Sequence, residues 1–530
     1  MQPAEIPLAS ANVDFDLLNH SSTFIYPFNH KIASAQDRRR LESLEECWSP
    51  WWRRLDDRQI SVLLDSTYFF LPYIREVLFP ETSLVRGTST DGYESSIKKL
   101  RYYSQKGLTY TCSDLPAHNV LRFAYKEPLL AEIASFSVVP FDRSGAPIRP
   151  GLPAQLAWVD VVVFTSGLGF LLLKVHLAQD AQTISQAMEL NYYLRMVHPP
   201  SIDWRLPALS FNGSSADIKL RDLLDFLTQG FVDDTPIERD LLRYKTRLKE
   251  TNAPRYSDTE AGQIFGERCH FLSYACVNFD SQKAQKAEGI FSNPEDHLLF
   301  EFASSLQLGD SVSNPMWIPA AAQTKQLMDQ NRFAFWRCWR GMSLKESVVF
   351  LGTEDIGFNR VVLPQNIEYN YLPLYIYTLH QKYKLFTFSS ELMRKSGRDQ
   401  GNLSELRFLM DSFMKFRNRY WFSEVTRKPL GSELYRKFQY GLEVPALYEL
   451  VSNEVKDLKE YYEQQHEQRI SILLAILTFV FLPLGAVVGI FGMTFFSQGS
   501  WRSFIVACVL VEIVSLGVWK WWTQDGLPDN

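Results

Sequence analysis

Cysteine is scarce in this sequence, and so are the short motifs that identify common cofactor sites. Six cysteines are scattered over 530 residues, and no pair has the C-x-x-C spacing of a zinc ribbon or a thiol redox pair. Phosphate-binding loops of the Walker or G-x-G-x-x-G type do not occur. Lys174, His176 and Asp180 lie close together in the chain, but their spacing matches no catalytic motif. The sequence therefore predicts a protein that is not an enzyme.

The N-terminus lacks the features of a secretory signal. Its first twenty residues contain Glu5, Asp14 and Asp16 and no apolar core, which favours a reduced, cytoplasmic N-terminal domain. The net charge is −5, from 55 basic and 60 acidic residues that are interleaved along the chain. Because no basic patch stands out, we expect no nucleic-acid partner.

Long apolar runs are present only near the C-terminus. Ile470 to Phe491 contains no charged residue, and at about 1.5 Å per helical residue it is roughly as long as a bilayer core is thick. A second run, Ser503 to Trp522, contains one acid, Glu512, and ends in a cluster of tryptophans. The runs predict a hairpin of two transmembrane helices, with a pair of buried core helices as the alternative.

The charges that flank the two runs predict their orientation. Lys456, Lys459 and Arg469 precede the first run and Lys520 ends the second, whereas only Arg502 lies between them. By the positive-inside rule both termini are cytoplasmic, which predicts a multi-pass protein of the cell (inner) membrane with the lipid bilayer as a partner.

The residues before the runs predict a soluble α/β region. We expect a mostly helical N-terminal extension at 1–130 and a cytoplasmic α/β domain at 131–400. Alternating or β-rich segments predict strands at 133–141, 155–164, 169–177, 269–279, 333–340 and 347–351. Helical periodicity follows the second and third of these strands, at 181–197 and 216–227. Strands interleaved with helices predict a layered α/β domain.

A helical stalk is expected at 401–469. Asn402 to Val425 has helical periodicity, and a second apolar stripe advances in steps of three and four through Leu447, Val451, Val455, Leu458 and Tyr462. No helix breaker separates this stripe from the first apolar run. One helix from Pro445 to Gly492 would be about 70 Å long, too long for a compact domain, so we expect it to connect the α/β domain to the hairpin.

The string FLPLGAVVGIFGMTFF, from Phe481 to Phe496, resembles the pore signature of the CorA family of divalent-cation channels. The residues that match the family pattern are Phe481, Leu482, Pro483, Leu484, Gly489, Ile490, Gly492, Met493 and Phe495. Three features differ from the family pattern. Thr494 replaces an asparagine, Gly485 replaces a threonine, and the loop from Phe496 to Trp501 lacks an acidic residue.

The resemblance implies a CorA-like homo-pentamer that conducts Mg²⁺ or a related divalent cation as its transported ion, with no covalent cofactor. Residues 470–492 would line the pore, 493–502 would form the outer loop, 503–522 the second span and 523–530 a cytoplasmic tail. Gly492, Met493 and Thr494 would form the outer mouth, and Pro483 would kink the pore helix. The implied pore-lining and gate residues are Gln468, Ser471, Leu474, Thr478, Leu482, Gly485 and Gly489.

Other interpretations of these residues stay open. The leucines fit simple packing between helices, and Thr478 fits a hydroxyl bonded to a carbonyl one turn back. The enlarged α/β domain favours gating by a ligand, and a nucleotide second messenger would make the chain a membrane effector of a type III CRISPR or other phage-defence system. A membrane signalling or scaffold protein without transport is the third reading.

Overall fold

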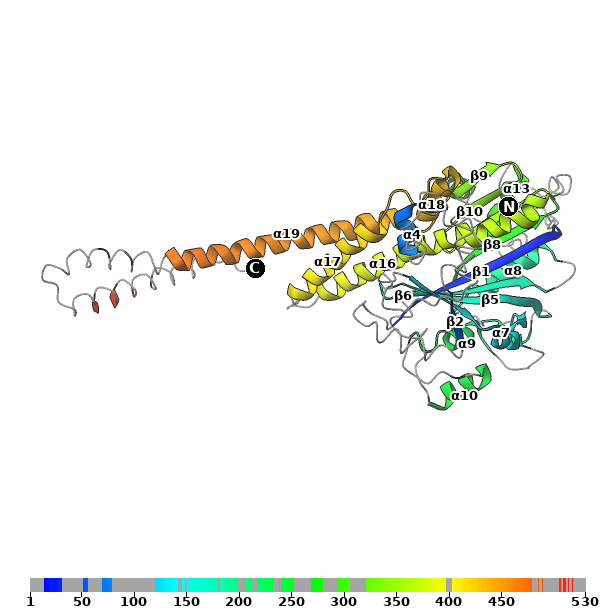
Figure 1. Cartoon of the computed structure of the whole chain (residues 1–530), viewed down its shortest axis with the longest axis horizontal. Helices are drawn as coiled ribbons and strands as arrows, with labels where there is room; N and C mark the ends of the chain where they lie inside the picture. The colour runs from blue at the N-terminus through cyan, green and yellow to red at the C-terminus, as the bar shows by residue number, and fades with distance from the viewer. Residues whose placement is uncertain are drawn as a thin grey trace, which may run out of the picture. The chain divides into compact units, whose positions relative to one another are not determined.

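The computed structural model divides the chain into two compact units, Met1–Tyr448 and Glu449–Asn530 (Figure 1). It describes residues 14–30, 51–55, 69–78, 120–141, 145–147, 150–164, 166–178, 182–198, 206–211, 218–232, 238, 240–251, 268–279, 293–305, 321–396 and 403–478, with a few isolated residues beyond.

An eleven-stranded mixed sheet forms the centre of the first unit. Its order is β2-β3-β5-β6-β1-β8-β11-β10-β9, with β4 beside β5 and β7 beside β4. Strand β8 runs parallel to β11, and the other pairs are antiparallel. The strands are β1 (Leu17–Asn29), β2 (Trp52–Leu55), β3 (Val120–Tyr125), β4 (Ser135–Val139), β5 (Leu152–Phe164), β6 (Leu168–Leu177), β7 (Ala208–Phe211), β8 (His270–Val277), β9 (Arg332–Trp336), β10 (Trp339–Ser343) and β11 (Ser347–Gly352).

The first face of the sheet is covered by helices α8 (Ile184–Leu194), α9 (Leu220–Leu227) and α13 (Pro294–Ser304), with α10 (Leu241–Thr251) beside α9. Alternate residues of each strand point to this face. Phe24 of β1 lies opposite Phe271 of β8, and both rings are buried with the helices in one apolar core. Thr183 and Gln186 form a capping box that fixes the start of α8.

The second face carries one long helical stretch. It runs through η6 (Phe358–Val362), α15 (Leu363–Asn366), η7 (Ile367–Tyr371) and α16 (Leu372–Ser396), where η denotes a π-helix. Tyr371 stacks on Phe350 of β11 at 5.6 Å between ring centroids, and Tyr383 packs on Phe170 of β6. The two helical faces make this unit a three-layer α/β/α arrangement.

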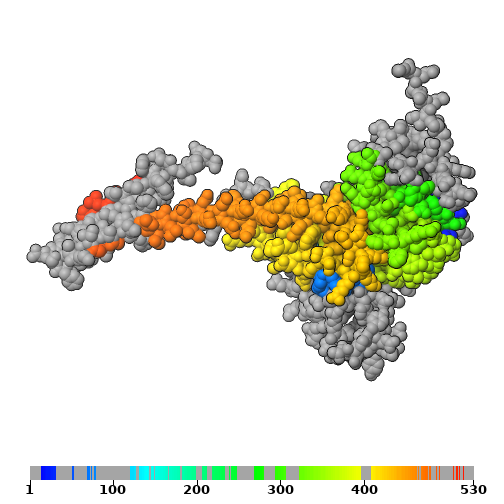
Figure 2. Space-filling view, turned by 90° about the horizontal axis from the view of Figure 1, so that it is seen from above, coloured from blue at the N-terminus to red at the C-terminus, as the bar shows by residue number. Residues whose placement is uncertain are grey.

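The remaining helices of the first unit are short or peripheral to the sheet. They are α4 (Pro72–Leu78), α7 (Glu127–Ile133), α14 (Ala321–Asn331), α17 (Leu403–Tyr420) and α18 (Pro429–Gly441). Helix α17, coloured yellow, contributes part of the surface in Figure 2.

The strands and helices expected for the α/β domain are largely confirmed. The hairpin at 155–177 is β5 and β6, and its turn contains Gly167 at a φ of 95°, a value that glycine adopts without strain. The single strand expected at 333–340 is instead a hairpin, since Arg337 and Cys338 form a turn between β9 and β10.

The mostly helical extension expected at 1–130 is wrong for the described residues. Strand β1 occupies the middle of the sheet between β6 and β8, and β2 and β3 extend one edge. The sheet therefore begins near Leu17, not near residue 131. Helices α17 and α18 also lie in the same compact unit as the sheet, beyond the boundary expected at residue 400.

The helix predicted to start near Pro445 is α19 (Val444–Ile476), with 33 residues. The predicted fold class, an α/β domain with a stalk and two transmembrane helices, is nevertheless contradicted. In the part of the chain that the structure describes, no helix is long and apolar enough to cross a membrane. Within α19 charged residues continue to Arg469.

The related expectations of transmembrane helices, an ion channel and a multi-pass protein of the cell membrane are corrected by the same finding. Most of the two expected spans, 470–492 and 503–522, lies outside the described residues, as do the loop 493–502 and the tail 523–530.

Candidate functional site

The described pore candidates lie at the end of α19 and just beyond it. Gln468, Ser471, Leu474 and Thr478 follow one another at steps of three or four, so they share one side of the helix, and all four side chains are exposed. Their apolar neighbours are exposed as well: Ile470, Ile472, Leu473, Leu474 and Leu477 have exposed fractions between 45% and 65%. This segment, 470–477, is called the apolar end of α19 below.

The hydroxyl of Thr478 is used within its own helix. Its Oγ1 donates to the backbone oxygen of Leu474 at 2.8 Å, the bond to a carbonyl one turn back that is common for threonine. The oxygen keeps its acceptor capacity, because a hydroxyl has two lone pairs.

The other predicted site residues are only partly described. Gly485 and Gly489 are helical, and a Cβ added to either would meet no atom within 4 Å. Leu482, Pro483, Gly492, Met493 and Thr494 lie outside the described residues.

The preceding part of α19 carries exposed acids. Glu449, Asp457, Glu460, Glu463 and Glu467 are exposed. Lys459 pairs with Glu463 at 3.5 Å, one helical turn away. Exposed charges with a pair one turn apart are typical of a solvated helix face. Because acids predominate, this part of α19 is negatively charged.

A polar cluster that sequence reasoning missed joins the sheet to the π-helix η7. Lys174 of β6 forms an ion pair with Glu368 of η7, and the Nε1 of Trp158 on β5 donates to the same carboxylate at 3.1 Å. The ammonium nitrogen of Lys174 also lies 5.9 Å from the centre of the Trp158 ring. The cluster therefore fixes η7 to strands β5 and β6 through one carboxylate.

His176 follows this cluster on β6 and has a structural role. Its Nδ1 donates to the backbone oxygen of His20 on β1 at 2.7 Å. Burial lowers the pKa of His176, and the nearby Lys174 lowers it further. Of the three residues noted in the sequence, the structure thus places Lys174 and His176 on one strand, and Asp180 lies outside the described residues.

On the first face, buried polar side chains bond to one another. Ser22 of β1 donates to Asn191 of α8 at 2.6 Å and lies 2.8 Å from the Oγ of Ser273 on β8. His20 lies 3.0 Å from Ser22, and burial lowers its pKa to about 3. The imidazole is therefore neutral at physiological pH, which suits a packed interior.

A hydrogen-bonded junction connects α16 to α17 and α18. The Nε2 of Gln381 on α16 donates to the backbone oxygen of Tyr420 at 2.7 Å and lies 2.9 Å from the hydroxyl of Tyr435 on α18. Tyr377 donates to the same Tyr420 oxygen at 2.9 Å. All of these side chains are buried, so the end of α17 is held in one position.

Aromatic stacking continues this junction to the first turns of α19. Tyr448 stacks on Trp421 at 3.9 Å with the rings 9° apart, and on Phe413 of α17 at 6.1 Å. These contacts join β6 to η7, α16 to the end of α17, and Tyr448 in the first turns of α19 to Trp421, which follows α17.

Metal ligation has little support among the residues that are described, since no group of three or more His, Cys, Asp or Glu side chains there could hold a metal ion. Cys269, Cys276 and Cys338 are free thiols. Burial raises the pKa of the Cys269 thiol, which keeps it protonated and unreactive.

Comparison with known proteins adds no family assignment. No protein-family model matches the chain, and no curated protein matches it.

Proposed function

We propose that the chain is a subunit of a homo-oligomeric divalent-cation transport protein of the CorA type, with Mg²⁺ or a related metal as its cargo. In this proposal five copies associate through α19, and the α/β unit regulates transport by binding a ligand. No covalent cofactor and no catalytic step are required.

One observation carries the proposal, namely the exposure of the apolar end of α19. Its five aliphatic side chains lie within about two turns of helix, and each is about half exposed or more. Exposed apolar area costs roughly 25 cal/mol per Å², so such a segment is stable only when other apolar groups cover it. Copies of the same helix around an axis would cover the flanks and leave Ser471, Leu474 and Thr478 facing inward.

The contacts inside the first unit support the regulatory part of the proposal. An ion pair joins β6 to η7, η7 continues into α16, and hydrogen bonds and stacked rings join α16 and α17 to the first turns of α19. The π-helix η7 lies on this route, and π-helical segments occur frequently at functional sites.

Uptake of Mg²⁺, Ni²⁺ and Zn²⁺ by cells that lack their own magnesium uptake tests the transport part. Cells that express the full chain should take up at least one of these ions faster than cells without it. Thr478→Val should reduce the rate severalfold because it removes the oxygen and keeps the shape, whereas Thr478→Ser should retain it. Ile472→Val, six residues before Thr478 and on another side of the helix, is the matched control and should leave uptake unchanged. Background uptake in cells with a well-expressed, folded chain would disprove transport.

A second candidate function is an oligomeric signalling protein that moves no ion. The exposed apolar end of α19 fits it equally well, since other copies of the helix can cover these side chains without forming a path for ions. A ligand-dependent change in the purified oligomer without any ion uptake is the result expected for this candidate.

A further inference from the structure

An exposed apolar patch lies at the end of the sheet formed by β9. It comprises Phe335 and Trp336 at the end of β9 and four residues at the start of the long helical stretch, Ile356, Phe358, Val361 and Val362. Their exposed fractions are 42%, 61%, 37%, 39%, 55% and 42%, respectively. Phe358, Val361 and Val362 belong to η6, and all three are exposed, whereas Asn359 of the same helix is buried. These six residues are called the edge patch.

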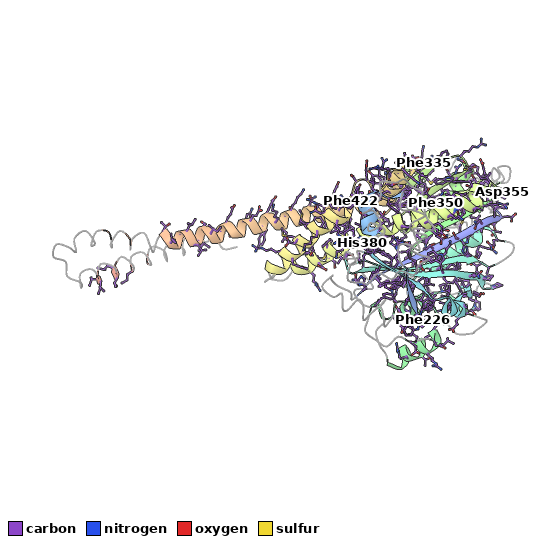
Figure 3. All side chains as sticks on the ribbon, viewed as in Figure 1. Phe226, Phe335, Phe350, Asp355, His380 and Phe422 are labelled. Carbon is purple, nitrogen blue, oxygen red and sulfur yellow. The ribbon has the colours of Figure 1, made fainter. Side chains whose placement is uncertain are left out.

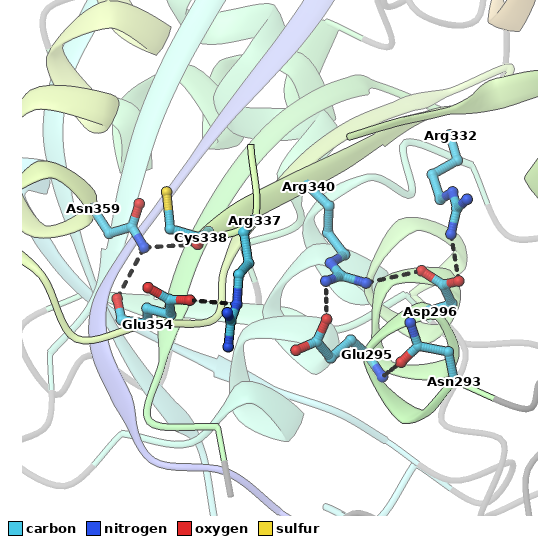
Figure 4. Close-up of polar contacts among 9 residues, drawn as sticks. All are labelled: Asn293, Glu295, Asp296, Arg332, Arg337, Cys338, Arg340, Glu354 and Asn359. Atoms are coloured by element: carbon cyan, nitrogen blue, oxygen red, sulfur yellow. Dashed lines mark hydrogen bonds and ion pairs between the residues drawn. The ribbon is translucent and has the colours of Figure 1, made fainter. Parts of the chain in front are cut away.

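The two parts of the edge patch are held together by polar contacts (Figure 4). The Nδ2 of Asn359 donates to the backbone oxygens of Cys338 at 2.8 Å and Glu354 at 2.9 Å. The amide of Thr353 donates to the same Cys338 oxygen at 3.1 Å. Arg337 pairs with Glu354 at 3.6 Å. The turn after β9 and the residues before η6 therefore form one surface, and Figure 3 labels Phe335 and Asp355 in this part of the first unit.

Ion pairs with helix α13 also hold the β9–β10 hairpin in place. Arg340 of β10 donates to Asp296 of α13 at 3.1 Å and pairs with Glu295, and Arg332 of β9 pairs with Asp296 (Figure 4). Asn293 caps α13 by accepting from the amide of Glu295. A surface held in this way loses little conformational freedom when a partner binds to it.

The size of the edge patch fits a specific contact. Large aromatic side chains bury about 150–250 Å² each, so the six exposed portions amount to roughly 500 Å². Monomeric proteins seldom expose contiguous apolar patches much larger than this without a functional reason. Two such patches facing each other would bury roughly 1,000 Å², the lower limit for a specific interface, before any backbone contact along β9 is counted.

The charges around the edge patch favour a second copy of the chain as the partner. Its charged neighbours have both signs, in the ion pairs of Arg337 with Glu354 and of Arg360 with Asp355. The side chain of Arg337 is 97% exposed, and that of Glu354 is 42% exposed. A rim with balanced charges is complementary to a copy of itself in a two-fold arrangement, whereas a strongly acidic or basic partner would meet like charges.

Strand β9 supplies the backbone part of such a contact. Among the described strands, β9 is the last in the sheet order. One side of its backbone is therefore paired with β10, and the other side forms an edge of that sheet. Edge strands pair readily with other strands, and two copies of one edge strand related by a two-fold axis are antiparallel.

We propose that the edge patch is a two-fold self-association surface through which two copies of this chain pair by β9 and η6. The pairing uses other residues than any association through α19, and it doubles the number of chains where its two-fold axis is perpendicular to the axis of the α19 assembly.

The mass of the purified full-length protein in solution tests this proposal. Val361→Glu and Trp336→Glu should each halve the particle mass at micromolar concentration, because each puts a charge at an apolar contact. If five chains also associate through α19, the masses should be ten and five chains; if they do not, two and one. A failure of the proposed transport assembly and a failure of the edge-patch pairing therefore give different masses.

Mixing variants of opposite charge makes the test specific for a two-fold contact. With Val361 placed next to the two-fold axis, Val361→Glu and Val361→Lys should each be unpaired alone, and an equimolar mixture should recover the wild-type mass because the two opposite charges then face each other. Met393→Glu, at a side chain that is 75% exposed on α16, is the matched control and should leave the mass unchanged. Circular dichroism and the thermal midpoint should match the wild type for all variants.

The proposal is overturned if folded Val361→Glu and Trp336→Glu keep the wild-type mass. It is likewise overturned if the charge mixture stays unpaired, which would indicate a contact of another geometry. A loss of mass by Met393→Glu equal to that of the two patch variants would have the same consequence.

Discussion

The sheet of the first unit and the apolar end of α19 have similar side chains in opposite environments. In β6, Leu171 and Phe170 have no exposed area, and the neighbouring residues on both faces are nearly as buried. In α19, Leu473 is 65% exposed and Ile472 57%. The difference shows that a single chain completes the sheet but leaves the end of α19 uncovered. The first unit therefore buries its apolar core within one chain, and in the proposed assembly other copies cover the end of α19.

The largest expected effect compares equal truncations in the two regions. Leu171→Ala should lower the free energy of unfolding of the first unit by about 3–4 kcal/mol, because it opens a cavity in a fully buried core. Leu473→Ala should change it by less than about 0.5 kcal/mol. Urea unfolding followed by tryptophan fluorescence measures both values, and similar values for the two variants would refute the comparison.

A somewhat smaller effect is expected at the junction below the sheet. Gln381→Leu removes the donor to Tyr420 and leaves a buried carbonyl and the Tyr435 hydroxyl with fewer partners, at a cost of about 2–3 kcal/mol. Gln439→Leu is the control, since its contact with Gln381 is 3.3 Å long and only partly buried. Its expected cost is below about 1 kcal/mol in the same urea experiment.

The free energy of unfolding of the first unit should fall at acid pH because of its buried histidines. Burial lowers the pKa of His20 to about 3 and that of His30 to about 4, so the unfolded chain binds more protons below its own histidine pKa near 6.5. The stabilisation is complete above that value and is lost as the pH falls from 6.5 towards 4. Each histidine should cost about 2 kcal/mol at pH 5. Thermal midpoints from pH 7.5 to 5 measure the loss, and His30→Gln should flatten the curve; an unchanged slope would count against this cause.

The smallest effect is expected for the polar cluster on the second face. The ion pair of Lys174 and Glu368 is partly exposed, with 14% and 26% of the two side chains accessible, so solvent screens it. Lys174→Met should cost about 1 kcal/mol or less, yet more than Lys459→Met, whose pair with Glu463 is over 60% exposed on both sides. Equal costs in a thermal scan would show that the cluster does not fix η7.

Local patterns made part of this structure predictable. The β5–β6 hairpin and helices α17 and α19 follow from periodicity within about thirty residues, and they are confirmed. Strand β1 was missed because its partners β6 and β8 lie about 150 and 250 residues away, and no local signal reports such pairing. The membrane interpretation was based on two apolar runs, on their flanking charges and tryptophans, and on the resemblance to a pore signature. Hydropathy does not distinguish apolar side chains that pack against other protein from those that face lipid.

Long-range pairs also explain why the polar cluster was missed. Lys174 and Glu368 are 194 positions apart, and only the packing of η7 on the sheet brings them together. The signal present in the sequence was a lysine that interrupts the apolar strand GFLLLKVHL, since a charge inside a buried strand requires a partner. The identity of that partner could not be read from the chain.

The central position of β1 has a consequence for synthesis on the ribosome. The strand is translated some 240 residues before β8, one of its two neighbours. Until then the growing polypeptide has an unfinished sheet, so chaperones should engage it throughout this interval. A gene shortened to start after Asn29 would encode a protein split between β6 and β8, and such a product should accumulate in inclusion bodies.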